Sequence, residues 1–214
     1  MIRSDWILAF PILMTAMVAG ACGSGGSSST CGSAQTCGGD LVGTWKVTSS
    51  CLSAAPEAFG VEGCPMAPTD LSKLAVAGTD TFKVDKTEEM VETFSGTVTI
   101  SFPSACIAWS GTPPDCSLVT SRLTASTTDP NSFFSVATCK TGGGGCVCDL
   151  TVRPMSMTKS MTYATAGAVL TETESDGTVS QSTYCVSGKT LTQHTDGKMM
   201  GTEGLTATVT LAKQ

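Results

Sequence analysis

"TFSGTVTISF", Thr93–Phe102, decides the fold class of this chain. Apolar residues or glycine occupy every second position, and serine or threonine occupies the positions between them. Because successive side chains of a strand point to opposite faces, this alternation predicts a strand with one buried face and one hydroxyl-rich face. The same alternation runs through "LTATVTLA", Leu205–Ala212, and "LVGTWKV", Leu41–Val47. We therefore expect an all-β protein.

Turn signals divide the chain into short segments. Asp176-Gly177 and Asp196-Gly197 favour hairpin turns, and turn glycines also stand in Ser187–Lys189 and Thr165–Gly167. Five strands in an up-and-down meander are therefore expected over residues 156–212. Further strands are expected near residues 41–49, 73–84, 90–102, 117–126, 132–139 and 146–153, with short helices over Ser53–Phe59 and Thr69–Leu74.

Consecutive hairpins without helical crossovers give an antiparallel sheet. A long antiparallel meander avoids exposed edges best by closing on itself. The expected fold is an antiparallel up-and-down β-barrel, and an open β-sandwich is the alternative.

The N-terminus has the pattern of an export signal, with Arg3, the apolar run Trp6–Val18 and small residues before Cys22. The run of 13 residues is shorter than the ~20 that a membrane-spanning helix needs. "AGAC", Ala19–Cys22, resembles the lipobox of bacterial lipoproteins, in which the cysteine becomes the acylated first residue of the mature chain. The resemblance implies a signal peptide over residues 1–21, an acylated Cys22 with a flexible Gly/Ser tether over 22–39, and one β domain over 40–214.

The lipobox also implies a location. The residue after the cysteine is Gly23 and not aspartate, which in lipoproteins favours the outer membrane, so Cys22 is expected to anchor the protein there, on the periplasmic or the surface side. The alternative is cleavage near Ala21 and secretion of a soluble protein.

The chain has eleven cysteines, an odd number that an exported protein must explain. With Cys22 assigned to lipid, ten remain, enough for five disulfides in an oxidising compartment. Local spacing suggests Cys31–Cys37, Cys51–Cys64 and Cys106–Cys116, with the other four pairing among themselves. The ten disulfide candidates are Cys31, Cys37, Cys51, Cys64, Cys106, Cys116, Cys139, Cys146, Cys148 and Cys185.

The length and the net charge of the chain limit the number of domains and the class of partner. Without residues 1–21 the 214-residue chain keeps 193, enough for one domain with a sizeable core. The formal net charge is −6, and lysine and arginine do not cluster in the sequence. A nucleic-acid partner is therefore not expected, because such proteins carry a basic stripe.

Gly43-Thr44-Trp45 resembles the Gly-x-Trp that opens the first strand of lipocalins and lipocalin-like domains. Thr183–Lys198 is similar to the strand–turn–strand repeats near the end of bacterial lipocalin-like domains. The resemblance spans residues 40–212 and implies that Gly43 and Trp45 lie at the closed base of a barrel. In lipocalins an arginine near the last strand packs on the tryptophan; here Arg122 and Arg153 lie in mid-chain, and Lys213 is expected to be a poor substitute.

A lipocalin-like barrel would carry a small apolar ligand, because a barrel of eight strands can hold one small molecule. The alternative is that the same side chains only fill the core. The residues expected to line the ligand are Phe82, Val98, Ile100, Phe102, Met157, Met161 and Tyr163.

The sequence contains few residues or motifs typical of a catalytic site. His194 alternates with Leu191 in a predicted strand and is expected to face solvent, and no Gly-x-Ser-x-Gly motif occurs. Glu172 and Glu174 share one face of a predicted strand and are interpreted as solvated, as are Glu88, Glu89 and Glu92. Neither an enzyme nor a cofactor is predicted.

A metal site is not predicted either. "CKTGGGGCVC", Cys139–Cys148, lacks the paired cysteine knuckles typical of zinc sites. Met155, Met157 and Met161 could suit copper(I), but methionine is also a common core residue.

These observations support a first hypothesis of a non-enzymatic, lipid-anchored envelope protein that binds a small apolar ligand in a barrel. The second hypothesis is a surface interaction, adhesion or envelope-assembly module that binds another protein. Copper handling by methionine and cysteine is the third.

Overall fold

The structure is a computed structural model of the 214-residue chain, and it describes residues 31–32, 34–54, 67–110, 113–128, 132–199 and 202–214. The protein is mostly antiparallel β-sheet, as the alternating sequence pattern predicts. Its elements are β1 (Gly43–Ala54), β2 (Thr69–Asp70), β3 (Leu74–Phe82), β4 (Thr87–Pro103), η2 (Ser104–Ser110), α1 (Cys116–Thr127), β5 (Phe134–Gly142), β6 (Gly145–Ala166), β7 (Val169–Glu174), β8 (Val179–Ser187), β9 (Thr190–Met199) and β10 (Thr202–Lys213).

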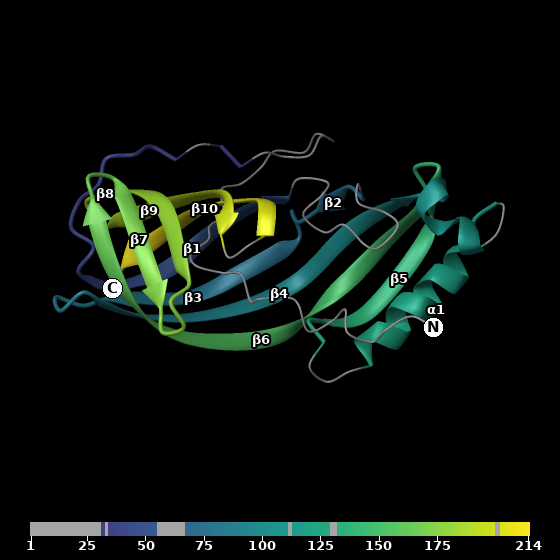
Figure 1. The fold of residues 1–214 in the computed structure, drawn as a ribbon, viewed down its shortest axis with the longest axis horizontal. Helices are drawn as coiled ribbons and strands as arrows, with labels where there is room; N and C mark the ends of the chain where they lie inside the picture. The colour runs from purple at the N-terminus through teal and green to yellow at the C-terminus, as the bar shows by residue number, and fades with distance from the viewer. Residues whose placement is uncertain (1–30, 33, 55–66, 111–112, 129–131, 200–201) are drawn as a thin grey trace. The chain divides into compact units, whose positions relative to one another are not determined.

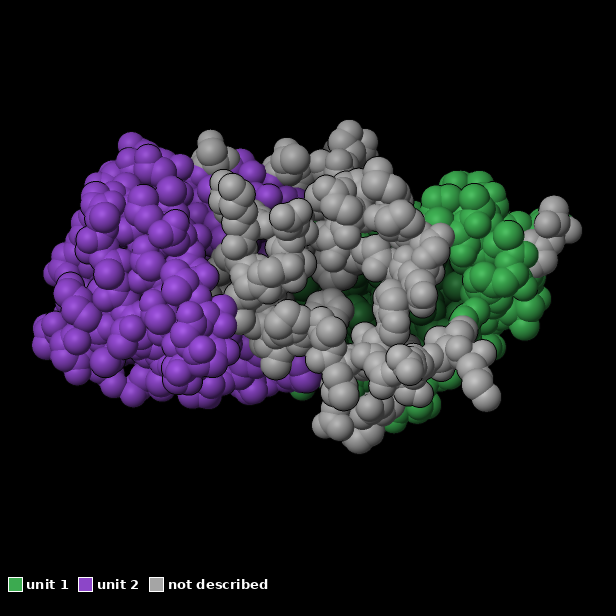
Figure 2. All heavy atoms as spheres, viewed as in Figure 1, with its two compact units in different colours: residues 1–12, 54–74, 95–154 green, residues 13–53, 75–94, 155–214 purple. Residues whose placement is uncertain are grey.

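The chain divides into two compact units, which Figure 2 colours separately. The described part of unit 1 falls within Ala54–Leu74 and Ser95–Pro154, and that of unit 2 covers the described residues of 31–53, 75–94 and 155–214. Strands β4 and β6 contribute to both units, because the boundaries fall inside them.

Unit 2 contains a closed ring of strands (Figure 1). The strand order β4–β3–β1–β10–β9–β8–β7–β6 is completed by pairing of β4 with β6, so the ring has eight strands. Alternate residues of these strands are buried, among them Trp45, Phe94, Leu170 and Leu191. We call this buried side of the strands the inner face of the ring.

Most expected turns are confirmed. Glycine at positive φ closes three hairpins of unit 2, at Gly167, Gly177 and Gly188, where φ is 61°, 87° and 60°. The turn expected at Asp196-Gly197 is wrong, because both residues belong to β9, and Asp196 pairs with Thr206 of β10. A register shift between Glu203 and Thr206 lets β9 continue past the dipeptide.

Unit 1 contains β2, the second part of β4, η2, α1, β5 and the first part of β6. The strand expected over residues 117–126 is wrong, because this segment forms α1. Asp115 caps the helix by accepting a hydrogen bond from Ser117 N at 2.9 Å, and Cys116 and Val119 bury its inner side. The many serines and threonines hide this helical spacing in the sequence.

The two expected short helices also need correction. Thr69–Asp70 forms β2, which pairs with β4, so the helix over Thr69–Leu74 is wrong. Of Ser53–Phe59, the first two residues end β1 and the rest lie outside the described residues. The loop expected around Pro103–Asp115 contains the 3₁₀ helix η2.

All nine cysteines of the described residues are disulfide-bonded, which confirms the prediction of a disulfide-stabilised fold. The pairs Cys31–Cys37 and Cys106–Cys116 expected from local spacing are wrong, as is Cys51–Cys64, since Cys51 has another partner. Sheet pairing brings distant segments together and so overrides spacing along the chain. The four described bonds join Cys31 to Cys51, Cys37 to Cys185, Cys116 to Cys146, and Cys139 to Cys148; Cys64 and Cys22 lie outside the described residues.

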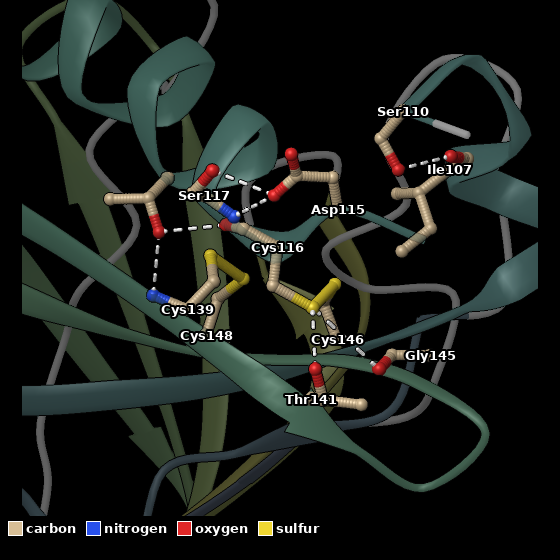
Figure 3. The surroundings of a disulfide bond; sticks show 11 residues. Ile107, Ser110, Asp115, Cys116, Ser117, Cys139, Thr141, Gly145, Cys146 and Cys148 are labelled. Carbon is tan, nitrogen blue, oxygen red and sulfur yellow. Dashed lines mark hydrogen bonds between the residues drawn. A yellow bond between two sulfur atoms is a disulfide. The ribbon is translucent and has the colours of Figure 1, made fainter. Parts of the chain in front are cut away.

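Two disulfides of unit 1 fasten α1 and the β5–β6 hairpin (Figure 3). Cys139 and Cys148 face each other in the register of β5 and β6, so their bond crosses the hairpin directly. Cys116, at the start of α1, is bonded to Cys146 of β6. Thr120 Oγ1 accepts from Cys139 N at 2.9 Å and donates to Cys116 O at 2.9 Å, which ties the helix to β5.

Gly78 in β3 allows β4 to approach closely. Its φ is +153°, and a Cβ atom there would clash with Val91 O and lie 2.9 Å from Glu92 Cα. We expect Gly78→Ala to lower the free energy of unfolding by about 3 kcal/mol, because the backbone of β4 must move and the dihedral is strained. Urea denaturation measures the change. Gly32→Ala, where the added methyl meets nothing within 4 Å, is the control and should change stability by less than about 0.5 kcal/mol. Equal effects of the two variants would contradict the steric argument.

Candidate functional site

Four carboxylic acids are buried on the inner face of the ring. Asp80 of β3, Glu88 and Glu92 of β4, and Glu172 of β7 are each at most 1% exposed. The interpretation of Glu88, Glu92 and Glu172 as solvated is therefore wrong, whereas Glu89 is exposed as expected. We call Asp80, Glu88, Glu92 and Glu172 the acid cluster.

The alternation of side chains between the two faces of β4 explains why its two acids are buried. Glu88 and Glu92 share one face with Met90 and Phe94, which are fully buried, whereas Glu89 points the other way. The sequence "EEMVETF", Glu88–Phe94, therefore predicts the burial of Glu88 and Glu92 once the strand is known to begin at Thr87 rather than near residue 90.

Burial dominates the electrostatics of the acid cluster. Desolvation raises the pKa of Asp80 from 3.8 to about 7 and that of Glu172 from 4.5 to about 8, and it raises the pKa of Glu88 and Glu92 well above 4.5. The charges of Asp80 and Glu172 further raise the pKa of both β4 acids, which shows that the four groups lie within electrostatic reach of each other. Lys159 acts in the opposite direction on Glu92 and Glu172.

Most oxygens of the acid cluster lack a protein partner. Ser180 Oγ lies 3.2 Å from Glu172 Oε2, but both carboxyl oxygens of Asp80 and both of Glu92 make no hydrogen bond. Buried polar atoms in native proteins are nearly always paired, since each unpaired one costs roughly 1–3 kcal/mol. These oxygens therefore make this part of the inner face the candidate site.

Neutral polar groups continue the inner face on β8 and β9. Gln193 is fully buried, and neither its Nε2 nor its Oε1 has a partner; Ser182 Oγ and Thr195 Oγ1 are also buried and unpaired. Ser182 is the next residue along the same face from Ser180, which contacts Glu172. The inner face of unit 2 thus offers carboxyl, amide and hydroxyl groups together.

Trp45 is buried in unit 2 and packs against a cation. Its ring is fully buried, and its Nε1 donates to Leu41 O at 2.6 Å. Lys213 Nζ lies 5.0 Å from the centre of the indole ring and donates to Val42 O at 2.8 Å. Lys213 was expected from the sequence to be a poor substitute for the arginine of lipocalins. In the structure it is the cation that packs on the tryptophan.

Gly43 makes room for this lysine, because a Cβ at residue 43 would lie 2.7 Å from Lys213 Cε. We expect Lys213→Met, which keeps the aliphatic stem, to lower the free energy of unfolding by about 1 kcal/mol through loss of the cation–π contact and the hydrogen bond to Val42. Thermal denaturation at low and high salt measures the effect. Lys73→Met, a lysine at an exposed position of unit 1, is the control, and an equal loss there would contradict the role of Lys213.

The residues expected to line a ligand fall in two places. Phe82, Met161 and Tyr163 are buried in unit 2, where the rings of Phe82 and Tyr163 meet edge-on at 5.1 Å, and Met157 is half-buried there. Tyr163 Oη donates to Lys83 O at 2.8 Å. The other three, Val98, Ile100 and Phe102, are buried in unit 1.

A pocket of about 430 Å³ also lies in unit 2, beside β4, β6 and β7. Of the acid cluster only Glu88 reaches it, and most of its lining residues are exposed or half-buried hydroxyl or charged residues. Of its lining residues, only Glu88 has a buried side-chain oxygen without a hydrogen-bond partner. It is lined by Lys83, Thr87, Glu88, Glu89, Ser160, Met161, Thr162, Thr173, Glu174 and Ser175.

His194 does not join the acid cluster. It alternates along β9 with the inner-face residues Gln193 and Thr195, and its Nδ1 lies 2.8 Å from Thr208 Oγ1, so it belongs to the outer side of the strand. Within the described ranges, no three residues among histidine, cysteine, aspartate and glutamate are placed to hold a metal ion.

The fold and the site together define a disulfide-bonded all-β protein with an acidic inner face. Comparison with protein-family models, with curated proteins and with solved structures gave no match. Of the helices that the structure describes, none is long and apolar enough to cross a membrane.

Proposed function

We propose that unit 2 is a lipocalin-like barrel that binds one small molecule against its inner face. The observation that carries this proposal is the set of buried polar groups without partners, among them Asp80, Glu92 and Gln193. A molecule bound there would supply the missing hydrogen bonds, which is how ligand sites use a few polar groups in an apolar surround. The eight-stranded ring and the Trp45–Lys213 contact support the comparison with lipocalins.

Binding rather than catalysis is proposed because, among the described residues, the carboxyl oxygens of Asp80 and Glu92 have no hydrogen-bond partner that could act as a nucleophile or a base. His194 lies on the opposite face of β9 from Gln193, so it cannot act as the base for a group beside the acid cluster.

We further propose that the protein is anchored to the envelope through Cys22, on the evidence of the lipobox sequence. The disulfides support an oxidising compartment. The described part of the expected tether is fastened to unit 2 by Cys31–Cys51 and Cys37–Cys185, which leaves residues 22–30 as the spacer. Intact mass of the membrane fraction tests the anchor: the mature chain should carry acyl groups, and Cys22→Ala should no longer sediment with membranes.

Photo-crosslinking tests ligand binding. A neutral, diazirine-bearing fatty alcohol should bind the full mature protein saturably at one site and, on illumination, label inner-face positions such as Ser182 and Gln193. The adjacent outer residues Thr183 and His194 are the matched controls and should remain unlabelled. Non-saturable labelling, or labelling confined to the outer positions, would overturn the proposal.

A further inference from the structure

Acidic and apolar residues alternate along the inner face of β4. Glu88, Met90, Glu92 and Phe94 follow one another there, and all four are fully or almost fully buried. Such a surface complements a molecule that has a positive charge and an apolar body. An uncharged apolar ligand would leave the carboxyl groups without partners.

We propose that the inner face of unit 2 binds a small amphipathic organic cation, whose ammonium group is held by Asp80 and Glu92 and hydrogen-bonded by neutral groups of β8 and β9. The inference rests on the proposed ligand-binding function and names the chemical class of the ligand.

The positively charged side chains near the acid cluster are too few to neutralise its four carboxyl groups. The cluster holds four carboxyl groups, contributed by β3, β4 and β7. Lys159 of β6 faces it, but its Nζ lies 2.6 Å from Glu174 Oε1 and so already has a carboxylate partner. Tyr163 of β6 and Tyr184 of β8 also share the inner face but carry no positive charge. A ligand with a positive charge would supply what the protein groups lack.

Gln193 gives independent evidence for a bound ligand. It is fully buried, opposite Tyr184 in β8 and Val209 in β10, which are both buried inner-face residues. Its amide therefore points to the same interior as the acid cluster, with one donor group and one acceptor unused. Ser182 and Thr195 add two unpaired hydroxyl groups on the neighbouring positions of β8 and β9. An ammonium group donates only, so these groups suit a ligand that bears a further polar atom.

An organic cation fits this face better than a metal ion. In the part of the chain that the structure describes, three or more metal-ligating side chains do not converge on one point. Carboxyl groups spread over three strands, with Met90 between the two of β4, match an elongated molecule rather than a single ion.

Binding of a cation must expel protons from the acid cluster. Without a bound cation, the carboxyl groups of Asp80 and Glu172 are largely neutral at pH 6, because burial raises their pKa values to about 7 and about 8. An ammonium ion favours the ionised form, so at least one proton leaves when it binds. Affinity should therefore rise with pH between 5.5 and 8.

Calorimetric titration with 2-phenylethylamine, compared with its uncharged analogue 2-phenylethanol, tests the inference on the full mature protein. The amine should bind at least tenfold more tightly than the alcohol at pH 8, should bind more tightly at pH 8 than at pH 5.5, and should release protons to the buffer. Asp80→Asn should weaken amine binding by about tenfold or more while the protein stays folded, since one charge-assisted hydrogen bond is lost. Glu89→Gln, an exposed acid next to Glu88, is the matched control and should leave the affinity unchanged.

Further arms of the experiment separate this inference from the proposed function. If the neutral diazirine probe binds but the amine binds no better than the alcohol, the cationic ligand is excluded and the binding function stands. If neither the amine nor the neutral probe binds, both proposals fail. If Ca²⁺ binds stoichiometrically and displaces the amine, the site belongs to a metal ion and the organic cation is excluded.

Discussion

Replacing Asp80 by asparagine is expected to stabilise the protein by on the order of 4 kcal/mol at pH 8 and to leave its stability at pH 4 nearly unchanged. The side chain is almost completely buried and neither of its carboxyl oxygens has a hydrogen-bond partner. Its pKa of about 7, against 3.8 in the unfolded chain, corresponds to about 4 kcal/mol at 1.36 kcal/mol per pKa unit. Asparagine has the same shape and carries no charge that must be desolvated.

The sign follows from proton binding in the two states. Below pH 4 the carboxyl group is protonated in both the folded and the unfolded protein, so its ionisation contributes nothing. Between pH 4 and 7 the unfolded chain releases the proton while the folded protein keeps it, so the free energy of unfolding falls as the pH rises. Above pH 8 the contribution is constant. Glu172, whose pKa is about 8, adds to the same slope.

Chemical denaturation of the wild type and of Asp80→Asn at pH 4, 6 and 8 measures this effect. Asp176→Asn is the control of opposite sign, because Asp176 is exposed in the β7–β8 turn and accepts a hydrogen bond from Thr178 N at 2.8 Å, which lowers its pKa. That variant should lose stability at neutral pH and not at acid pH. A stability difference for Asp80→Asn that does not change with pH would contradict the burial of an ionisable group. Stabilisation together with weakened amine binding would indicate that the acid is kept for function.

Replacing Trp45 by alanine is expected to lower the free energy of unfolding by about 4 kcal/mol, the cost typical of removing a fully buried aromatic side chain. The substitution removes the packing around a fully buried ring, the hydrogen bond to Leu41 O and the surface on which Lys213 lies. Trp45→Phe should lose about half as much, since the ring is largely kept while the indole N–H is lost.

Trp109→Ala provides the matched deletion at an exposed site. Trp109, on η2 of unit 1, is 50% exposed and its ring lies 4.5 Å from the Arg122 guanidinium carbon. Its removal should cost less than about 1 kcal/mol by urea denaturation. If Trp45→Ala were no more destabilising than Trp109→Ala, the burial of Trp45 in the core of unit 2 would be contradicted.

The sequence predicted some strands well because each has one buried face. Cys148, Leu150 and Val152 of β6, expected on one inward face, are all buried. In β10, Ala207, Val209 and Leu211 are buried while the threonines between them are not. Period-two alternation is a local property, so local reasoning finds it.

The acid cluster was missed for a physical reason. Charged residues are almost never buried without partners, so an acid in a strand is read as solvated unless its register is known. Moving the start of β4 from near residue 90 to Thr87 leaves the alternation unchanged, but it brings Glu88 into the strand on the side of Met90. No sequence feature predicted the burial of Asp80, although it lies on the same face of β3 as the buried residues Val76 and Phe82.

The number of cysteines predicted that disulfides form, but it did not predict which cysteines are bonded to each other. Cys37 is bonded to a residue 148 positions away. Backbone hydrogen bonds from Cys37 N and Gly38 N to Tyr184 O place the two segments side by side. No spacing rule contains that contact, because it depends on which strands become neighbours.

The sequence by itself determined that this protein is an all-β, disulfide-bonded chain with an export leader pattern, since alternation, cysteine count and an apolar N-terminal run are properties of neighbouring residues. Only the tertiary structure decided that β4 pairs with β6 to close a ring, that Lys213 meets Trp45, and that four acids share one inner face. These features join residues far apart in the chain, and their energies arise from burial and approach that exist only once the strands are assembled.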